Sequence, residues 1–298
     1  MPRLQRILIV LLAAVGVAAA QATSAAVATP APGPQSQTAS HASPWFFYSS
    51  AQAQSNRYGQ AYVWSNTLGY RVSPRVAVLA GVPYYSFHMA NNAGGVSGFG
   101  DAYLALQVLS SHDRVRLVTT LTGTAPTGNR TAGLSSRRAT VDFDNRVNVA
   151  YGRLVPFLDL GIANTITNET FLVQPVTSYG WVGHAQAGGN IYLTHRLAVG
   201  AAAYGVFPLG TQNVYSRGIS PLNPSPTPGQ SGGASLDRDH GYGVWVLASP
   251  IPWFQIQASF SRSHSPLGSR SGVMGSWLGS LYGKKACWAP LLSITCRK

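Results

Sequence analysis

The sequence predicts an all-β protein: an antiparallel transmembrane β-barrel of about twelve strands, within a range of ten to fourteen, with long external loops and short periplasmic turns. Three observations predict this fold. Apolar and polar residues alternate over many long segments, whereas strands of soluble proteins mostly end after about five or six residues. The connections alternate between short and long, and each segment combines an apolar face with a polar one.

The chain begins with the pattern of a secretory signal peptide. Arg3 and Arg6 precede an apolar run at 7–17, and Ala20 and Ala22 flank a position typical of signal-peptide cleavage. The apolar run is too short to cross a bilayer as a helix, which needs about 20 residues. We therefore expect a signal peptide at 1–22, a disordered leader rich in Ala, Pro, Ser and Thr at 23–44, a β-barrel domain at 45–283 and a C-terminal tail at 284–298.

Period-2 alternation predicts twelve strands. They span 45–54, 58–72, 75–87, 98–109, 114–125, 141–151, 153–164, 180–192, 197–208, 241–248, 253–262 and 272–282. From the second strand onward, short and long connections alternate without exception, as periplasmic turns and external loops do in outer-membrane barrels. The first connection, 55–57, is short where this rhythm requires a long loop, so the first strand has the weakest support.

The two faces of the strands fit lipid on one side and water on the other. In RVRLVTTLT, which begins at Arg114, apolar residues share one face, and Arg and Thr share the other. Only closure removes the unpaired sheet edges that hydrocarbon does not tolerate. A secreted β-sandwich has the same period, but it does not require the loop rhythm or an interfacial girdle of aromatic residues. The residues expected in that girdle are Tyr58, Trp64, Tyr70, Tyr84, Tyr85, Trp181, Tyr192 and Trp253.

The polar faces supply candidates for the lining of the barrel lumen, with a few large apolar side chains among them. These candidates are Asp101, Gln107, Arg114, Arg116, Asp142, Asp144, Arg146, Asn148, Phe157, Asp159, His184, Gln186, Trp245, Gln255 and Gln257. Phe99 and Tyr103 are also expected to point inward. Asp142 and Asp144 share a face and could serve acid–base chemistry or bind a cation. Because arginines follow on the same and the neighbouring strand, a structural ladder of charges is the favoured interpretation.

The segment GFGDAYLALQ, which begins at Gly98, is better explained as a barrel strand than as a nucleotide-binding loop. A dinucleotide loop needs Gly-x-Gly-x-x-Gly between a strand and a helix. Here Tyr103 takes the third glycine position, and the apolar residues that follow alternate. We expect Asp101 and Gln107 to point inward, and Leu104 and Leu106 to face lipid.

The sequence predicts no catalytic, cofactor-binding or metal-ligating residue, and no enzymatic activity. The histidines are scattered, and no Cys/His cluster has metal-ligand spacing. Asp239 and His240 are the nearest approach to a catalytic dyad, but neighbours on a strand point to opposite faces. Cys287 and Cys296 could form a disulfide in an oxidising compartment or remain two thiols, and the sequence leaves both open.

The formal net charge of +13 indicates an anionic partner. Nucleic acid is not expected, because the arginines are scattered rather than gathered in a stripe. Export makes outer-membrane lipid and lipopolysaccharide the expected partners, together with a small apolar permeant. The oligomeric state is not predictable from the sequence.

The chain resembles a bacterial outer-membrane family named for the meta-cleavage pathway of phenol degradation. The resemblance rests on the order of YRVSPRVAVLAGVPY, GFGDAYLALQ, TGTAPTGN and GGNIYLTHRLAVGAAAYGVFPLG, and it covers about residues 58–262. Members are regarded as channels for hydrophobic, often aromatic, compounds, so the resemblance implies that function. The chain departs from such barrels at its end, which is Cys296-Arg297-Lys298 rather than an aromatic residue. Either the strand ending at Tyr282 closes the barrel and a tail follows it, or the terminus is atypical.

These observations favour an outer-membrane channel for the passive passage of small hydrophobic or aromatic compounds. A non-transporting structural or lipopolysaccharide-binding surface barrel is the alternative, and an outer-membrane hydrolase is the third possibility. Transport predicts a continuous inward path, a structural role predicts a plugged lumen, and hydrolysis requires catalytic groups that converge.

Overall fold

The structure is a computed structural model of the 298-residue chain. It describes residues 44–56, 59–89, 95–129, 132, 134–136, 138–165, 176–216, 234–235, 239–251, 254–264 and 269–278. The expected signal peptide, most of the leader, the C-terminal tail and both cysteines lie outside these residues.

The described residues form β-strands joined by turns and loops. In chain order the strands are β1 (Trp45–Asn56), β2 (Gly59–Ser73), β3 (Val76–Met89), β4 (Gly95–Phe99), β5 (Ala102–His112), β6 (Val115–Ala125), β7 (Thr140–Val149), β8 (Leu154–Ala163), β9 (Val176–Tyr192), β10 (Leu197–Ser216), β11 (Ala234–Ser235), β12 (Asp239–Ile251), β13 (Phe254–His264) and β14 (Ser269–Leu278).

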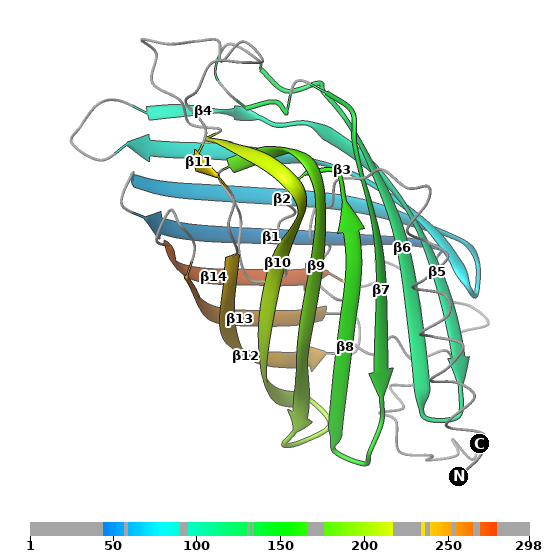
Figure 1. Ribbon diagram of the computed structural model, residues 1–298. Helices are drawn as coiled ribbons and strands as arrows, with labels where there is room; N and C mark the ends of the chain where they lie inside the picture. Colours follow the sequence, from blue (N-terminus) through cyan, green and yellow to red (C-terminus); the bar gives the residue numbers. More distant parts are fainter. Residues whose placement is uncertain are drawn as a thin grey trace.

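The sheet closes on itself (Figure 1). Each neighbour pair is antiparallel, β1 pairs with both β2 and β14, and β9 pairs with β10. The short strands β4 and β11 pair with β3 and β10 respectively, so within the described residues the closed ring has twelve members. β1, the least supported strand in the sequence, pairs with β2 along its whole length and with β14 from Phe47 to Asn56, and β14 is the closing strand.

The connections differ at the two ends of the barrel. Five connections at one end, here called the turn end, are short: 74–75, 113–114, 150–153, 193–196 and 252–253. Asp113 in one of them has a left-handed backbone (φ 49°), which Asp tolerates better than most residues. The opposite end, here called the loop end, carries the connections 57–58, 90–94, 126–139, 164–175 and 265–268, and the connection 217–238 that includes β11.

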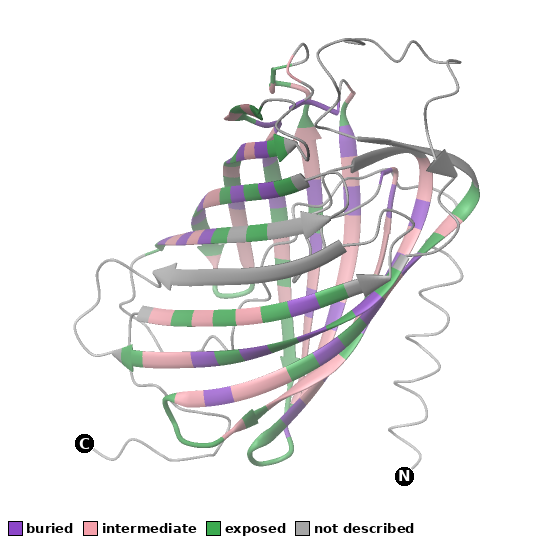
Figure 2. Ribbon diagram, turned by 90° about the vertical axis from the view of Figure 1, so that its left-hand side faces the viewer, coloured by how far each residue is buried: buried purple, intermediate pink, exposed green. Residues whose placement is uncertain are grey.

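Burial alternates along the strands, as the bands in Figure 2 show. On β5, Leu104 is 59% exposed whereas its neighbour Tyr103 is buried, and on β12 Val244 is exposed beside the buried Trp245. Large apolar side chains thus face outward, while Asp, Arg, Thr and Gln side chains occur on the buried face. The buried face also carries aromatic side chains such as Tyr85 and Trp245. The many exposed large apolar side chains suit a wall with lipid outside.

The structure corrects part of the expected aromatic girdle. Trp64, Tyr70 and Tyr84 are exposed on the outer surface, and Trp45, which the sequence analysis missed, packs on Tyr70 with ring centroids 4.7 Å apart. Tyr85 is instead only 2% exposed and stacks on Phe87 inside the barrel. Tyr192 packs against buried interior residues, and Trp181 is half-buried. Tyr58 and Trp253 lie outside the described residues.

The predicted fourth strand is interrupted. β4 and β5 both pair with β3, but Gly100 and Asp101 between them belong to neither. Gly100 packs so close to Tyr85 that a Cβ would lie 2.2 Å from the ring. The break also resets the alternation of the two faces, so Phe99, expected to point inward, is 66% exposed and packs edge-on against Tyr84 outside.

Candidate functional site

The buried face of the wall carries most of the candidate lining residues. Seven are buried: Asp101, Asp142, Arg146, Phe157, His184, Gln186 and Trp245. Seven others are half-buried: Gln107, Arg116, Asp144, Asn148, Asp159, Gln255 and Gln257. Arg114 was placed wrongly: β6 begins one residue later, so Arg114 belongs to the two-residue turn after β5 and is exposed. That the other side chains border a path for solutes remains a prediction.

Arg146 on β7 is held between an acid and an aromatic ring. Its guanidinium lies 3.5 Å from the Asp159 carboxylate on β8, and its Cζ lies 3.7 Å from the centroid of the Phe157 ring. The Arg146 Nε also donates a weak hydrogen bond to Asn148 at 3.4 Å. Because β7 and β8 place these positions side by side, Arg146 and Asp159 form an ion pair with a cation–π contact added. The ladder expected from the sequence involved Arg114 and Arg116 instead, and Arg116 pairs in register with Asn148.

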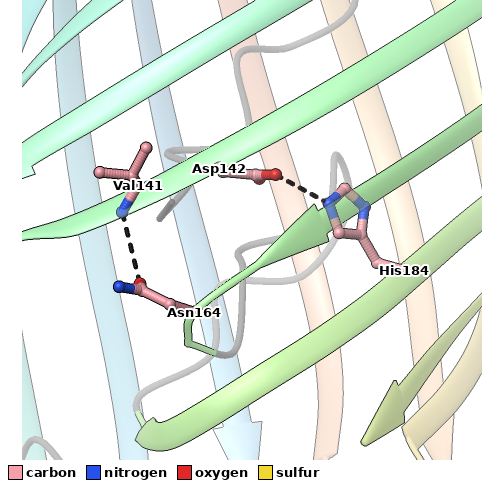
Figure 3. A network of polar contacts seen from close by, with 4 residues as sticks. All are labelled: Val141, Asp142, Asn164 and His184. Atoms are coloured by element: carbon pink, nitrogen blue, oxygen red, sulfur yellow. Dashed lines mark hydrogen bonds and ion pairs between the residues drawn. The ribbon is translucent and has the colours of Figure 1, made fainter. Parts of the chain in front are cut away.

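A second buried pair joins β7 to β9 across β8. Nε2 of His184 lies 3.1 Å from Oδ1 of Asp142, which is 1% exposed (Figure 3). Gly161 on β8 lies beneath the imidazole, and a Cβ there would be 2.2 Å from two ring atoms. A glycine on the intervening strand is therefore what allows the two side chains to meet. Near the start of β7, the Asn164 side chain accepts a hydrogen bond from the Val141 amide at 3.3 Å.

No described group of three or more His, Cys, Asp or Glu side chains could hold a metal ion. His240 of the weighed Asp239–His240 pair is exposed at the loop end. Asp142 and Asp144 were candidates for a carboxylate pair, but the partner of Asp142 in the structure is His184.

Asp101 anchors the loop 126–139. Its Oδ1 accepts a hydrogen bond from the Gly128 amide at 2.9 Å, and its Oδ2 accepts two from the amide and hydroxyl of Ser136, both at 2.6 Å. The Thr127 hydroxyl accepts another from the Ala102 amide. The strand break at Asp101 thus provides the carboxylate that fixes the loop.

This loop enters the barrel. Leu134 is 1% exposed and packs with Ala61 and Val63 of β2 and Tyr85 and Phe87 of β3, all buried. The cluster fills part of the interior near the loop end. Sequence reasoning missed it, because the loop's only signal was the small polar run TGTAPTGN.

An aromatic cluster occupies another part of the interior. Phe157 on β8 and Trp245 on β12 have ring centroids 6.3 Å apart, and Tyr192 packs against the same cluster. The Trp245 indole donates a hydrogen bond to Asn190 at 2.8 Å. Gly200 makes room for the indole, since a Cβ there would lie 2.2 Å from it.

The turn end contains a small hollow that opens to solvent. It is lined by Arg71, Ser73, Pro74, Arg75, Val76, Ala77, Gln107, Leu109, Arg116 and Val118. Gln107 and Arg116 were among the candidates, but Arg71 was missed. Its alternation with Tyr70 and Val72 at the end of β2 is the signal that could have found it.

Comparison of the sequence with models of known protein families finds no match, and comparison with curated proteins finds none either. Comparison of the structure finds an outer membrane channel from Pseudomonas putida F1, at 14% identity and a TM-score of 0.50, covering 78% of this chain and 91% of that one. The fold is that of an outer-membrane β-barrel.

Two further similar structures score lower. The NanC porin is 7% identical with a TM-score of 0.47, covering 77% of this chain and 98% of that one. The translocator domain of the autotransporter NalP from Neisseria meningitidis is 10% identical with a TM-score of 0.44, covering 80% and 89%. At such identities the similarity concerns the fold, and the predicted fold class is confirmed. The resemblance to the phenol-pathway family stays a prediction.

Proposed function

We propose that the chain is an outer-membrane channel for the passive passage of small apolar or aromatic solutes. One observation carries the proposal: the closed wall is apolar outside, while its inner face combines charged and amide side chains with aromatic rings and leaves a hollow at the turn end. The predicted signal peptide supports export, and the apolar exterior supports insertion in lipid.

The interior contacts favour an aromatic solute over a sugar. Twelve strands enclose less space than the 16 to 18 of open porins, and the Leu134 and Phe157–Trp245 clusters narrow it further. An aromatic solute gains from ring contacts and needs few hydrogen-bond partners, whereas a sugar must exchange many hydrogen bonds with water.

The same clusters also favour a second candidate, a non-transporting structural barrel, because a loop and a group of rings fill part of the interior. The two proposals differ in what happens when rings are removed. Rings along a path set the solute preference, whereas rings that act as a plug hold all solutes back.

Vesicle swelling separates the two functions. The full chain is reconstituted in lipopolysaccharide-containing vesicles, and the rates for arabinose and for benzyl alcohol are each measured above the rate of protein-free vesicles. After the protein-free rate is subtracted, we expect faster swelling with benzyl alcohol than with arabinose. Combined Phe157→Ala and Trp245→Ala substitutions should abolish this preference, whereas Phe99→Ala, at an exposed ring outside the barrel, should keep it. A wild-type chain that passes neither solute, or a double variant that only leaks both equally, would favour the structural barrel.

A further inference from the structure

The charged side chains that line the hollow at the turn end are all positive. Three arginines line it, Arg71 from β2, Arg75 from the following turn and Arg116 from β6, and its lining includes no Asp or Glu. Clefts lined by one sign of charge concentrate ligands of the opposite sign. Gln107 from β5 adds an amide that can donate a hydrogen bond to an anion.

The acids of the barrel interior lie nearer the loop end. Along β7 the inward positions run from Asp142 through Asp144 and Arg146 to Asn148, and Arg116 pairs in register with Asn148. Asp142 contacts His184, and Asp159 contacts Arg146. The acids of the interior therefore lie toward the loop end, with His184 and Arg146 as partners, whereas the turn end is basic.

Arg116 connects this hollow with the aromatic cluster. It pairs in register with Asn148 on β7, which in turn pairs with Phe157 on β8, and Tyr192 packs against the cluster of Phe157 and Trp245. The Tyr192 hydroxyl is buried, and no described residue hydrogen-bonds to it. A phenolic hydroxyl can donate to a carboxylate, and guanidinium groups bind carboxylates with paired hydrogen bonds. Aromatic surface and anion-binding groups thus adjoin each other at one end of the lumen.

We propose that this turn-end hollow binds the carboxylate of an aromatic acid, with Arg71 and Arg116 holding the anion and Tyr192 and its aromatic neighbours contacting the ring. The proposal deepens the proposed channel function by naming the class of solute, and it rests on that function only for transport. A neutral aromatic solute gains less from the two arginines than a carboxylate does, and a cationic one is repelled by them.

Three probes of similar size test the charge preference: benzoate, benzyl alcohol and benzylammonium. Binding of each to the full chain in detergent is measured by equilibrium dialysis at neutral pH. We expect benzoate to bind most tightly and benzylammonium most weakly. Arg71→Gln and Arg116→Gln should each weaken benzoate binding about tenfold, the size expected for one charge-assisted hydrogen bond, and leave benzyl alcohol unchanged.

The matched control is Arg114→Gln, which removes the same charge from the exposed turn two residues before Arg116 and outside the hollow. It should bind benzoate like the wild type. Each variant is first checked for a shift in gel mobility on heating, and one that lacks the shift is replaced by Arg71→Lys or Arg116→Lys, which keeps the charge and should retain most of the binding. Equal binding of the three probes, or benzoate binding that survives both Gln substitutions, would overturn the proposal.

Measuring the entry of benzoate and benzyl alcohol into vesicles distinguishes this proposal from the channel function. If benzoate binds through Arg71 and Arg116 but neither benzoate nor benzyl alcohol enters vesicles above the protein-free rate, the anion site stands and the channel function fails. If benzyl alcohol enters as readily as benzoate and the Gln variants change neither rate nor binding, the channel function stands and the anion site fails.

Discussion

Asp101 and Ser136 are joined by two hydrogen bonds of 2.6 Å each, from the Ser136 amide and hydroxyl to the same carboxylate oxygen. This contact links the break between β4 and β5 to a loop whose Leu134 is buried inside the barrel. A wall residue thus fixes the loop that narrows the interior. It also explains why Asp101, placed inside by its alternation, is buried while carrying a charge: charged acceptors are stable in such places when their hydrogen bonds are satisfied.

Asp101→Ala should release the loop. The Gly128 amide and both Ser136 donors would lose their acceptor, and a buried donor without a partner costs about 1–3 kcal/mol. We expect cleavage by trypsin after Arg138 to become at least about tenfold faster, because local opening becomes more frequent. Asp113→Ala, at an exposed turn, is the control and should leave the rate unchanged. Equal cleavage rates in the two variants would mean that Asp101 does not hold the loop.

Gly161→Ala should break the Asp142–His184 pair. The new Cβ would lie 2.2 Å from the imidazole and 2.9 Å from the Phe143 carbonyl oxygen, so the ring must move. Overpacking of this kind costs about 1–3 kcal/mol, and we expect the temperature of the heat-induced mobility shift to fall. Gly123→Ala on β6 is the matched control, because a Cβ there meets nothing within 4 Å. If both variants unfold at the wild-type temperature, the Cβ added at position 161 does not destabilise the barrel.

Arg146→Met should destabilise the barrel by about 3–5 kcal/mol, since it leaves the Asp159 carboxylate buried without its cation. The double variant Arg146→Met with Asp159→Leu should regain much of this loss, because no unpaired charge remains. Guanidinium chloride unfolding of the three proteins, followed by tryptophan fluorescence, measures the effect. A double variant no more stable than the single one would show that the pair is not the cause.

The alternation of the strands could be read from the sequence because lipid and interior impose opposite preferences on neighbouring residues. β6 and β7 follow it throughout, and the side chains of Arg116, Asp142 and Arg146 lie on the expected face. The errors fall where the alternation stops. Phe99 precedes the break at Gly100 and Asp101, and Arg114 precedes the first residue of β6. At the break the alternation is reset, so Phe99 faces outward, whereas Arg114 lies in the turn and is exposed.

The contacts inside the barrel were less predictable. Leu134 belongs to a loop, and the position of a loop depends on tertiary contacts such as those of Asp101 rather than on a local period. The meeting of Asp142 with His184 needs a glycine on the strand between them, which period and composition do not indicate.

Leu104→Arg should impair assembly in the membrane. Leu104 is exposed on the outer face of β5, and an arginine facing lipid costs about 2–4 kcal/mol at the bilayer midplane. We expect a smaller fraction of the protein to fractionate with outer membranes in the heat-modifiable form. Gln107→Arg, three residues along on the inner face, should keep the wild-type fraction. If Gln107→Arg lowers this fraction and Leu104→Arg does not, then lipid contacts the face that is assigned here to the barrel interior.

The most direct test of the central claim, that the barrel interior is a path for aromatic solutes, is the ion current through single copies of the full chain in planar bilayers. The account predicts small current steps that benzyl alcohol blocks and arabinose does not. Combined Phe157→Ala and Trp245→Ala substitutions should remove the block, since a ring contact contributes about 0.5–1.5 kcal/mol beyond its buried area, and Phe99→Ala should keep it. An absence of current steps, or equal block by both solutes in the wild type, would contradict the account.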